Sequence, residues 1–138
     1  MNFGNTDILT LIPQRPPFVL VDRLVEATPD EALSVYSVYS VSGQHPLVSC
    51  GCLSAAGLME NMAQTAAAHI GAVSEGEVRI GFIGAVKNMQ IYYRPQAGEQ
   101  ITTHIRVVQR VFDISLVEAE VRCGKQVCAR CELKIALQ

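Results

Sequence analysis

The most constraining feature of the sequence is a long apolar segment that runs from Leu53 to Val73. Its many alanines favour a helix, and Ser54 is a typical N-cap residue. Glu60 is the only formally charged residue in the segment. A helix that is apolar almost all round belongs in a protein core and not on a surface. The sequence therefore predicts a central helix that other elements must cover.

The chain after this helix has the alternating pattern of β-strands. Apolar and polar residues alternate from 127 to 135, from 117 to 123 and from 101 to 107, and residues 78–93 form a further long apolar run. Alternation with period two is typical of strands with one buried and one solvated face. Short turns such as Gly124-Lys125 join these strands, so we expect an antiparallel meander.

The chain before the helix predicts shorter elements. Residues 7–13 indicate a short helix capped by Thr6 or Asp7, and the β-branched run 18–25 indicates a strand. A turn at 28–31 leads into a second strand over 32–41, and residues 42–52 are irregular. The resulting prediction is one α+β domain over residues 1–138, in which an antiparallel sheet wraps a long central apolar helix.

Composition restricts the classes of function. Apolar residues make up 49% of the chain and charged residues only 17%, which indicates that another subunit covers part of the surface. The net charge of −2 argues against a nucleic-acid partner. No stretch has the length and flanks of a membrane span, and the first residues lack a signal-peptide pattern. We therefore expect a cytoplasmic protein.

The cysteines do not predict a metal or disulfide site. Five cysteines without a secretion signal argue against a disulfide framework. Cys128 and Cys131 have metal-ligand spacing, but in a strand these positions point to opposite faces. Cys50 and Cys52 lie in a loop with no further ligand beside them. We expect packing cysteines, no metal and no other cofactor, since phosphate-binding loops are also missing.

The sharpest candidate site is the polar group inside the apolar helix. Glu60 and Gln64 are four residues apart and therefore share a face, with Asn61 beside them. A carboxylate in such a helix must be paired, hydrogen-bonded, at an interface or neutralised. Burial favours the protonated carboxyl that a general acid requires near neutral pH. A structural hydrogen-bond network or a narrow solvated stripe is the alternative reading.

The candidate base is His45, in an irregular segment before the helix. Histidines in loops on a rigid scaffold are often catalytic, although a lone loop histidine is more often simply solvated. For His69 and His104 we expect structural roles.

Two motifs resemble one known family. The stretch Leu11-Ile12-Pro13-Gln14-Arg15-Pro16-Pro17-Phe18-Val19-Leu20-Val21-Asp22-Arg23 is similar to the opening of bacterial 3-hydroxyacyl-acyl carrier protein dehydratases. Glu60-Asn61-Met62-Ala63-Gln64 resembles the Glu-Ala-x-Ala-Gln of that family's central helix, and Lys87 to Glu99 is a looser match to its Arg-Pro-x-x-x-Gly-Asp turn.

The resemblance implies a hotdog fold that works as a dimer or a ring of dimers. It assigns Glu60 as the acid that protonates the departing hydroxyl and His45 as the base at the α-carbon, from neighbouring subunits. Backbone N–H groups near the helix N-terminus would polarise the thioester, which makes Gly57 a substrate-binding candidate together with Asn61 and Gln64. The substrate would be an acyl-phosphopantetheine thioester on acyl carrier protein, without a cofactor.

The middle of the chain departs from the family pattern. The family has Gly-His-Phe-Pro-Gly before a Pro-Gly helix start, whereas this chain has Gly43-Gln44-His45-Pro46-Leu47 and then Leu53-Ser54-Ala55-Ala56. The histidine is displaced by one place relative to Glu60. This altered middle resembles the divergent hotdog proteins of aryl polyene and related pathways, in which one subunit can be catalytically impaired and partner another.

Three functions therefore remain open at this point. The first is dehydration of a 3-hydroxyacyl thioester to the 2-enoyl thioester. The second is a catalytically impaired hotdog subunit that binds acyl chains or supports a partner dehydratase, and the third is thioester hydrolysis. We expect a homodimer, a higher oligomer or a heterodimer with a related hotdog subunit. Arg15, Arg23, Lys87 and Arg94 are candidates for docking an acidic carrier protein.

Overall fold

The structure is a computed structural model that describes residues 6–38, 45–73 and 81–137. Its elements, in chain order, are the short 3-10 helix η1 (Ile8–Thr10) and the strands and helix β1 (Arg23–Ala27), β2 (Glu31–Ser37), β3 (Val48–Ser49), β4 (Cys52–Leu53), α1 (Ala55–Val73), β5 (Gly81–Ile91), β6 (Gln100–Val111), β7 (Ile114–Cys123) and β8 (Gln126–Leu137).

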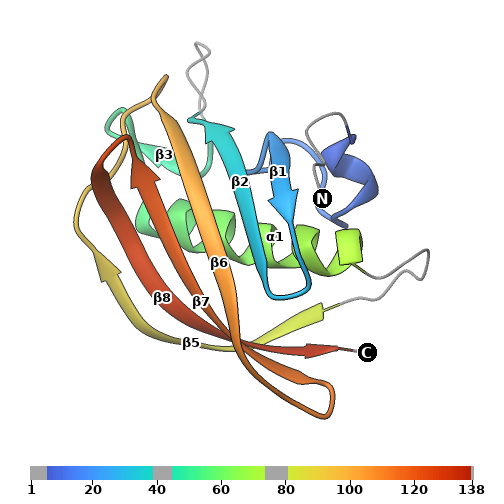
Figure 1. The fold of residues 1–138 in the computed structure, drawn as a ribbon. Coiled ribbons are helices and arrows are strands. Elements are labelled where there is room, and N and C mark those ends of the chain that lie inside the picture. Colours follow the sequence, from blue (N-terminus) through green and yellow to red (C-terminus); the bar gives the residue numbers. More distant parts are fainter. Residues whose placement is uncertain (1–5, 39–44, 74–80, 138) are drawn as a thin grey trace.

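Six strands form one antiparallel sheet in the order β1-β2-β6-β7-β8-β5. The sheet curls around α1, which lies across its concave face, while β3 and β4 form a separate small hairpin (Figure 1). The predicted α+β architecture of a long helix wrapped by an antiparallel sheet is confirmed, and it is the hotdog fold.

The start of α1 is fixed by the residue that the sequence indicated. Ser54 Oγ accepts the backbone N–H of Gly57 at 3.0 Å, and Ser54 O accepts the N–H of Leu58 at 2.9 Å. From there Leu58, Met62 and Ala66 follow at four-residue spacing with at most 1% of their surface exposed. These side chains form the helix face that packs on the sheet.

The opposite face of α1 is only partly covered by the chain itself. Met59 is 37% exposed, and Ala63, Ala67 and Ile70 are half-buried. These residues recur at three- and four-residue spacing and form one stripe, which we call the open stripe. A single curved sheet can cover only one side of a helix. The apolar open stripe on the other side is therefore available for contact with another element or subunit.

The predicted strand over residues 18–25 is wrong in its first half, since β1 begins only at Arg23. Leu20 and Val21 are both fully buried, although neighbours in a strand would face opposite sides. Side chains of α1 bind the backbone of this segment in place of a neighbouring strand. Residues 17–22 therefore run beside the helix outside the sheet, and we call them the extended segment.

Two further expectations are corrected by the strand pairing. Residues 48–52 of the predicted irregular region form the β3–β4 hairpin together with Leu53, which we predicted as the first helix residue, and the turn residues Cys50 and Gly51 have φ of 55° and 74°. A register shift between Val121 and Arg122 places Cys128 in the core with none of its surface exposed, so Cys128 and Cys131 do not lie on opposite faces. Parts of three predicted segments, residues 39–41, 42–44 and 78–80, lie outside the described residues.

The close packing of Gly71 near the end of α1 leads to a testable prediction. A Cβ added to Gly71 would lie 2.5 Å from the backbone oxygen of Leu11. Although alanine stabilises an ordinary helix by about 1 kcal/mol relative to glycine, Gly71→Ala is expected to lower the free energy of unfolding by about 1–3 kcal/mol, because the backbone must move. Urea unfolding measures the change. The control is Gly84→Ala, whose Cβ would lie 3.7 Å from the nearest oxygen; a Gly71→Ala protein at least as stable as the wild type contradicts the expectation.

His69 predicts a pH dependence of stability. The side chain is 3% exposed, and Nε2 donates to the carbonyl of Thr28 at 2.6 Å. Burial lowers the pKa of His69 below its ordinary value of 6.5, and it outweighs the hydrogen bond to Thr28, which acts in the opposite direction. The unfolded chain therefore binds a proton more readily, so this contribution to stability falls as pH drops below about 6.5. Melting temperatures between pH 8 and pH 5 should fall more steeply for the wild type than for His69→Gln, and equal slopes would rule out this role.

Candidate functional site

Glu60 and Gln64 lie one helical turn apart on α1 and are hydrogen-bonded. Gln64 Nε2 donates to Glu60 Oε1 at 3.0 Å. The Gln64 side chain is fully buried, whereas Glu60 is half-buried and borders the open stripe beside Met59. The carboxylate is therefore oriented by a hydrogen bond from its own helix and is only partly covered by the chain.

The rest of the Gln64 carboxamide binds the extended segment before β1. Its Nε2 also donates to Phe18 O at 2.6 Å, and its Oε1 accepts the N–H of Leu20 at 2.7 Å. Both amide hydrogens and the carbonyl oxygen of Gln64 thus have partners within the chain. Because these bonds hold the amide in one orientation, they also fix the direction from which it reaches Glu60.

Asn61 continues the same network toward the sheet. Its Nδ2 donates to Leu20 O at 2.6 Å, and its Oδ1 accepts the hydroxyl of Thr103 at 2.5 Å. All of these side-chain groups are fully buried. Asn61 and Gln64 therefore supply the hydrogen bonds that an adjacent strand would otherwise give to the backbone of residues 18–20. Their binding of substrate stays a prediction.

His45 lies at the other end of this extended segment. It is 7% exposed, and Nε2 pairs with Pro17 O at 2.7 Å, while Nδ1 accepts the N–H of Leu47 at 3.1 Å. A carbonyl only accepts hydrogen bonds, so in the neutral ring the proton is on Nε2. Nδ1 could take a proton from a substrate only after releasing Leu47. The assignment of His45 as the base stays a prediction.

His45 and Glu60 are connected through one stretch of backbone. His45 contacts Pro17, and Gln64 joins Phe18 to Glu60. His45 also lines an open groove of 420 Å³ between η1, the extended segment and the end of β2, whereas Glu60 is not among the lining residues of that groove. The two candidate groups therefore border different surfaces of one protomer.

The N-terminus of α1 presents backbone donors. The N–H of Gly57, a predicted substrate contact, donates to Ser54 Oγ within the helix cap. A Cβ at Gly57 would lie 2.5 Å from Leu53 Cδ1 and 3.2 Å from Leu47 O, so a larger residue here would displace the Leu53 side chain. Ala55 and Ala56 precede it as exposed residues at the positive end of the helix dipole. Substrate binding by Gly57 stays a prediction.

Two of the basic residues suggested for carrier docking are bound to backbone. The Arg94 guanidinium contacts carbonyls of the β3–β4 hairpin, and Arg15 Nη1 donates to the carbonyls of Ile12 and Gln14. Arg23 and Lys87 are exposed. Sequence reasoning missed the anchoring role of Arg94 and the role of Thr103, because both depend on partners about forty residues away in the chain.

The cysteines are all free thiols in the structure. Burial raises the pKa of Cys128 and of Cys131 to about 11, which keeps both protonated and poorly nucleophilic. Cys131 Sγ lies 3.6 Å from Met62 Sδ in the core. Within the described ranges, no three His, Cys, Asp or Glu residues are grouped as a metal site would require. In the same ranges, no helix has the length and hydropathy to cross a membrane.

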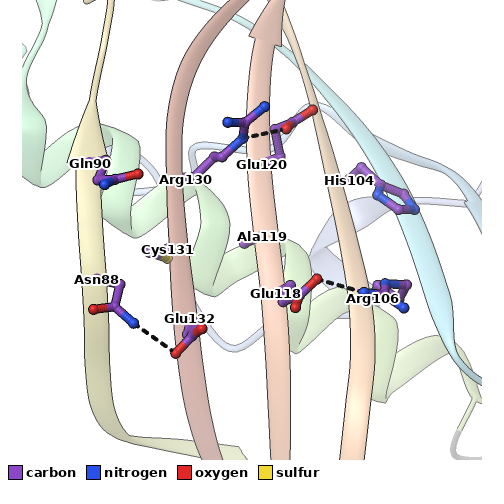
Figure 2. A pocket seen from close by; sticks show the side chains of 10 residues that line it. All are labelled: Asn88, Gln90, His104, Arg106, Glu118, Ala119, Glu120, Arg130, Cys131 and Glu132. Carbon is purple, nitrogen blue, oxygen red and sulfur yellow. Dashed lines mark hydrogen bonds and ion pairs between the residues drawn. The ribbon is translucent and has the colours of Figure 1, made fainter.

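A second hollow lies on the outer face of the sheet, away from α1. Figure 2 shows that it is lined by ion pairs and polar side chains, with Arg106 at 2.7 Å from Glu118 and Arg130 at 2.7 Å from Glu120. Although partial burial alone would raise the pKa of Glu120, hydrogen bonds from Arg122 and Arg130 lower it. These charges neutralise one another on an exposed surface, where each pair contributes little to stability. None of the predicted site residues lies there.

Comparison with known proteins identifies the family. The family model described as ApeP dehydratase, of the ApeP-like family, matches residues 6–137. A 3-hydroxyacyl-[acyl-carrier-protein] dehydratase FabZ from Lactococcus lactis subsp. cremoris (strain SK11) is 27% identical over 144 residues, covering 99% of this chain and 96% of the relative. The FabZ of Staphylococcus aureus (strain JH9) is 26% identical over 145 residues, with 99% and 95% covered.

A solved structure supports the fold independently. The dehydratase heterocomplex ApeI:P from Xenorhabdus doucetiae superposes with a TM-score of 0.83 at 15% identity, covering 96% of this chain and 91% of the other. At this identity the likeness shows the hotdog fold alone. The family model, in contrast, covers nearly the whole chain, including the extended segment, Glu60 and Gln64. The chain belongs to the ApeP-like dehydratase family.

Proposed function

We propose that this protein dehydrates a 3-hydroxyacyl thioester, carried on acyl carrier protein, to the 2-enoyl thioester. The observation that carries the proposal is the half-buried Glu60 carboxylate, held by Gln64 at the border of an apolar helix stripe. Membership of a dehydratase family supports the reaction class, and the names of the FabZ relatives support the carrier-protein substrate.

The reaction needs one base, one acid and a polarised carbonyl. The base removes a proton from C2, the C2=C3 double bond forms, and the C3 hydroxyl leaves as water after Glu60 donates a proton to it. Glu60 therefore acts in its protonated form, with Gln64 as the neighbour that fixes its direction. The donors at the N-terminus of α1 would stabilise the negative charge that develops on the thioester oxygen.

A second hotdog subunit completes the proposed site. The open stripe leaves Met59, Ala63 and Ile70 without full cover, and β5 ends the sheet with a free edge in the described part of the chain. A half-exposed apolar stripe and an open strand edge are both surfaces that a related subunit would cover. Such a contact would bury Glu60 further and bring it to a base from the other subunit.

A second candidate function is favoured by the geometry of His45. Both of its ring nitrogens contact backbone groups of the same chain. In that state the ring holds the extended segment, and the catalytic base would come from a related partner. The protein would then supply Glu60 to a site shared with that partner. The dehydratase heterocomplex ApeI:P from Xenorhabdus doucetiae, which has the same fold, supports such an arrangement.

Replacement of the acid tests the proposed reaction. Glu60→Gln keeps the size and the hydrogen bond but cannot donate the proton, so turnover should fall by about 10²–10⁴-fold with an unchanged melting temperature. The assay incubates the protein, alone and with a related hotdog subunit, with 3-hydroxyacyl carrier-protein thioesters. Mass spectrometry separates loss of water from release of free acid, which would indicate a thioesterase. Glu26→Gln, on an exposed position of β1, is the control.

The same assay separates the two candidate functions. If His45 is the base, His45→Ala lowers turnover as strongly as Glu60→Gln does. If His45 only holds the segment, a complex with the partner keeps its turnover after His45→Ala. Full turnover by the Glu60→Gln protein would remove Glu60 from the mechanism in both cases.

A further inference from the structure

Arg94 lies in the connection between β5 and β6, and its guanidinium binds the β3–β4 hairpin. Nε donates to Leu53 O at 3.0 Å, and Nη2 lies 3.1 Å from Ser49 O and 3.4 Å from Cys52 O. The same Nη2 is 3.3 Å from Ser49 Oγ. The planar guanidinium therefore contacts both strands of the hairpin, including Leu53, the last strand residue before the helix cap Ser54.

This hairpin is a second link between the two candidate catalytic residues, besides the extended segment. On its first side, His45 O accepts the N–H of Val48 at 3.1 Å, and His45 Nδ1 accepts the N–H of Leu47. On its second side it runs into Ser54, whose N–H donates to Leu47 O at 2.8 Å and whose side chain caps α1. A displacement of the hairpin would move His45 and the start of the Glu60 helix together.

The hairpin is too short to hold this position alone, since each strand has two residues. Its other support comes from the Arg94 connection itself, where Leu53 N donates to Pro95 O and Ala97 N donates to Gly51 O, each at 2.8 Å. The far side of this connection is fixed in turn by Glu99.

Glu99 holds the connection that carries Arg94. Its Oε1 accepts the hydroxyl of Tyr93 at 2.6 Å and the N–H of Gln96 at 2.7 Å, and its Oε2 accepts the thiol of Cys123 at 3.1 Å. The backbone beside Arg94 is thus tied to β7. The guanidinium therefore extends from a fixed base to the hairpin.

We propose that Arg94 is a positioning residue for the dehydration, which sets the placement of His45 and of the helix bearing Glu60. The inference rests on the proposed function. A rigid fork of donors suits three carbonyls at once, whereas a lysine ammonium on a flexible stem would hold fewer of them with less directional control. A small misplacement of catalytic groups lowers kcat strongly while leaving substrate affinity almost unchanged.

The test compares Arg94→Ala and Arg94→Lys with Arg110→Ala. Arg110 serves as the control because its guanidinium likewise binds a backbone carbonyl, that of Pro29, and in addition the carboxylate of Asp30, at the β1–β2 turn. In the wild-type assay mixture, with the partner subunit if that is required, Arg94→Ala should lower kcat by about 10–100-fold with KM within about twofold. Added methylguanidinium should restore part of the rate lost in Arg94→Ala and leave the rate of Arg110→Ala unchanged.

A second readout does not depend on turnover. Hydrogen exchange of the Leu53, Ser54 and Ala97 amides should be faster in Arg94→Ala than in Arg110→Ala, because the hairpin loses its anchor. A raised KM with unchanged kcat would assign Arg94 to carrier docking and overturn the proposal, as would unchanged amide exchange. A wild-type protein without turnover would overturn the proposed function, and the amide exchange would then still decide whether Arg94 fixes the hairpin.

Discussion

The carboxamides of Asn61 and Gln64 act as the neighbouring strand for a stretch of buried backbone. They meet the carbonyls of Phe18 and Leu20 and the N–H of Leu20 from inside an otherwise apolar helix. A buried backbone group without a partner costs about 1–3 kcal/mol. The segment before β1 can therefore pack against α1 only because these two side chains are present at the required spacing.

The same hydrogen bonds connect the packing of the core to the chemistry of the site. Gln64 is oriented by the extended segment, and its remaining N–H is directed at Glu60. His45 contacts the other end of that segment. The helix thus carries a structural face toward the sheet and, beside its open stripe, the carboxylate of Glu60 that we propose as the acid; the extended segment contacts both through Gln64.

The sequence predicted those parts of the fold that depend on local pattern. The long helix, its Ser54 cap and the three C-terminal strands follow from apolar spacing, and the spacing of Glu60 and Gln64 placed them on one face. It mispredicted residues 18–22 and Cys128, because strand pairing and register shifts depend on partners distant in the chain. The Arg94 contacts and the engaged ring of His45 depend on such distant partners as well, and no local motif indicates them. One domain over residues 1–138 and a cytoplasmic location stay predictions.

Whether Gln64 holds both the extended segment and Glu60 is tested by measuring the stability and turnover of Gln64→Met. Methionine fills a similar volume but leaves Phe18 O and Leu20 N without partners and releases Glu60. The free energy of unfolding is expected to fall by about 2–4 kcal/mol in urea, and turnover should fall as well under conditions where the variant stays folded. The exposed control Gln109→Met should change neither quantity. A Gln64→Met protein with wild-type stability and turnover would contradict it.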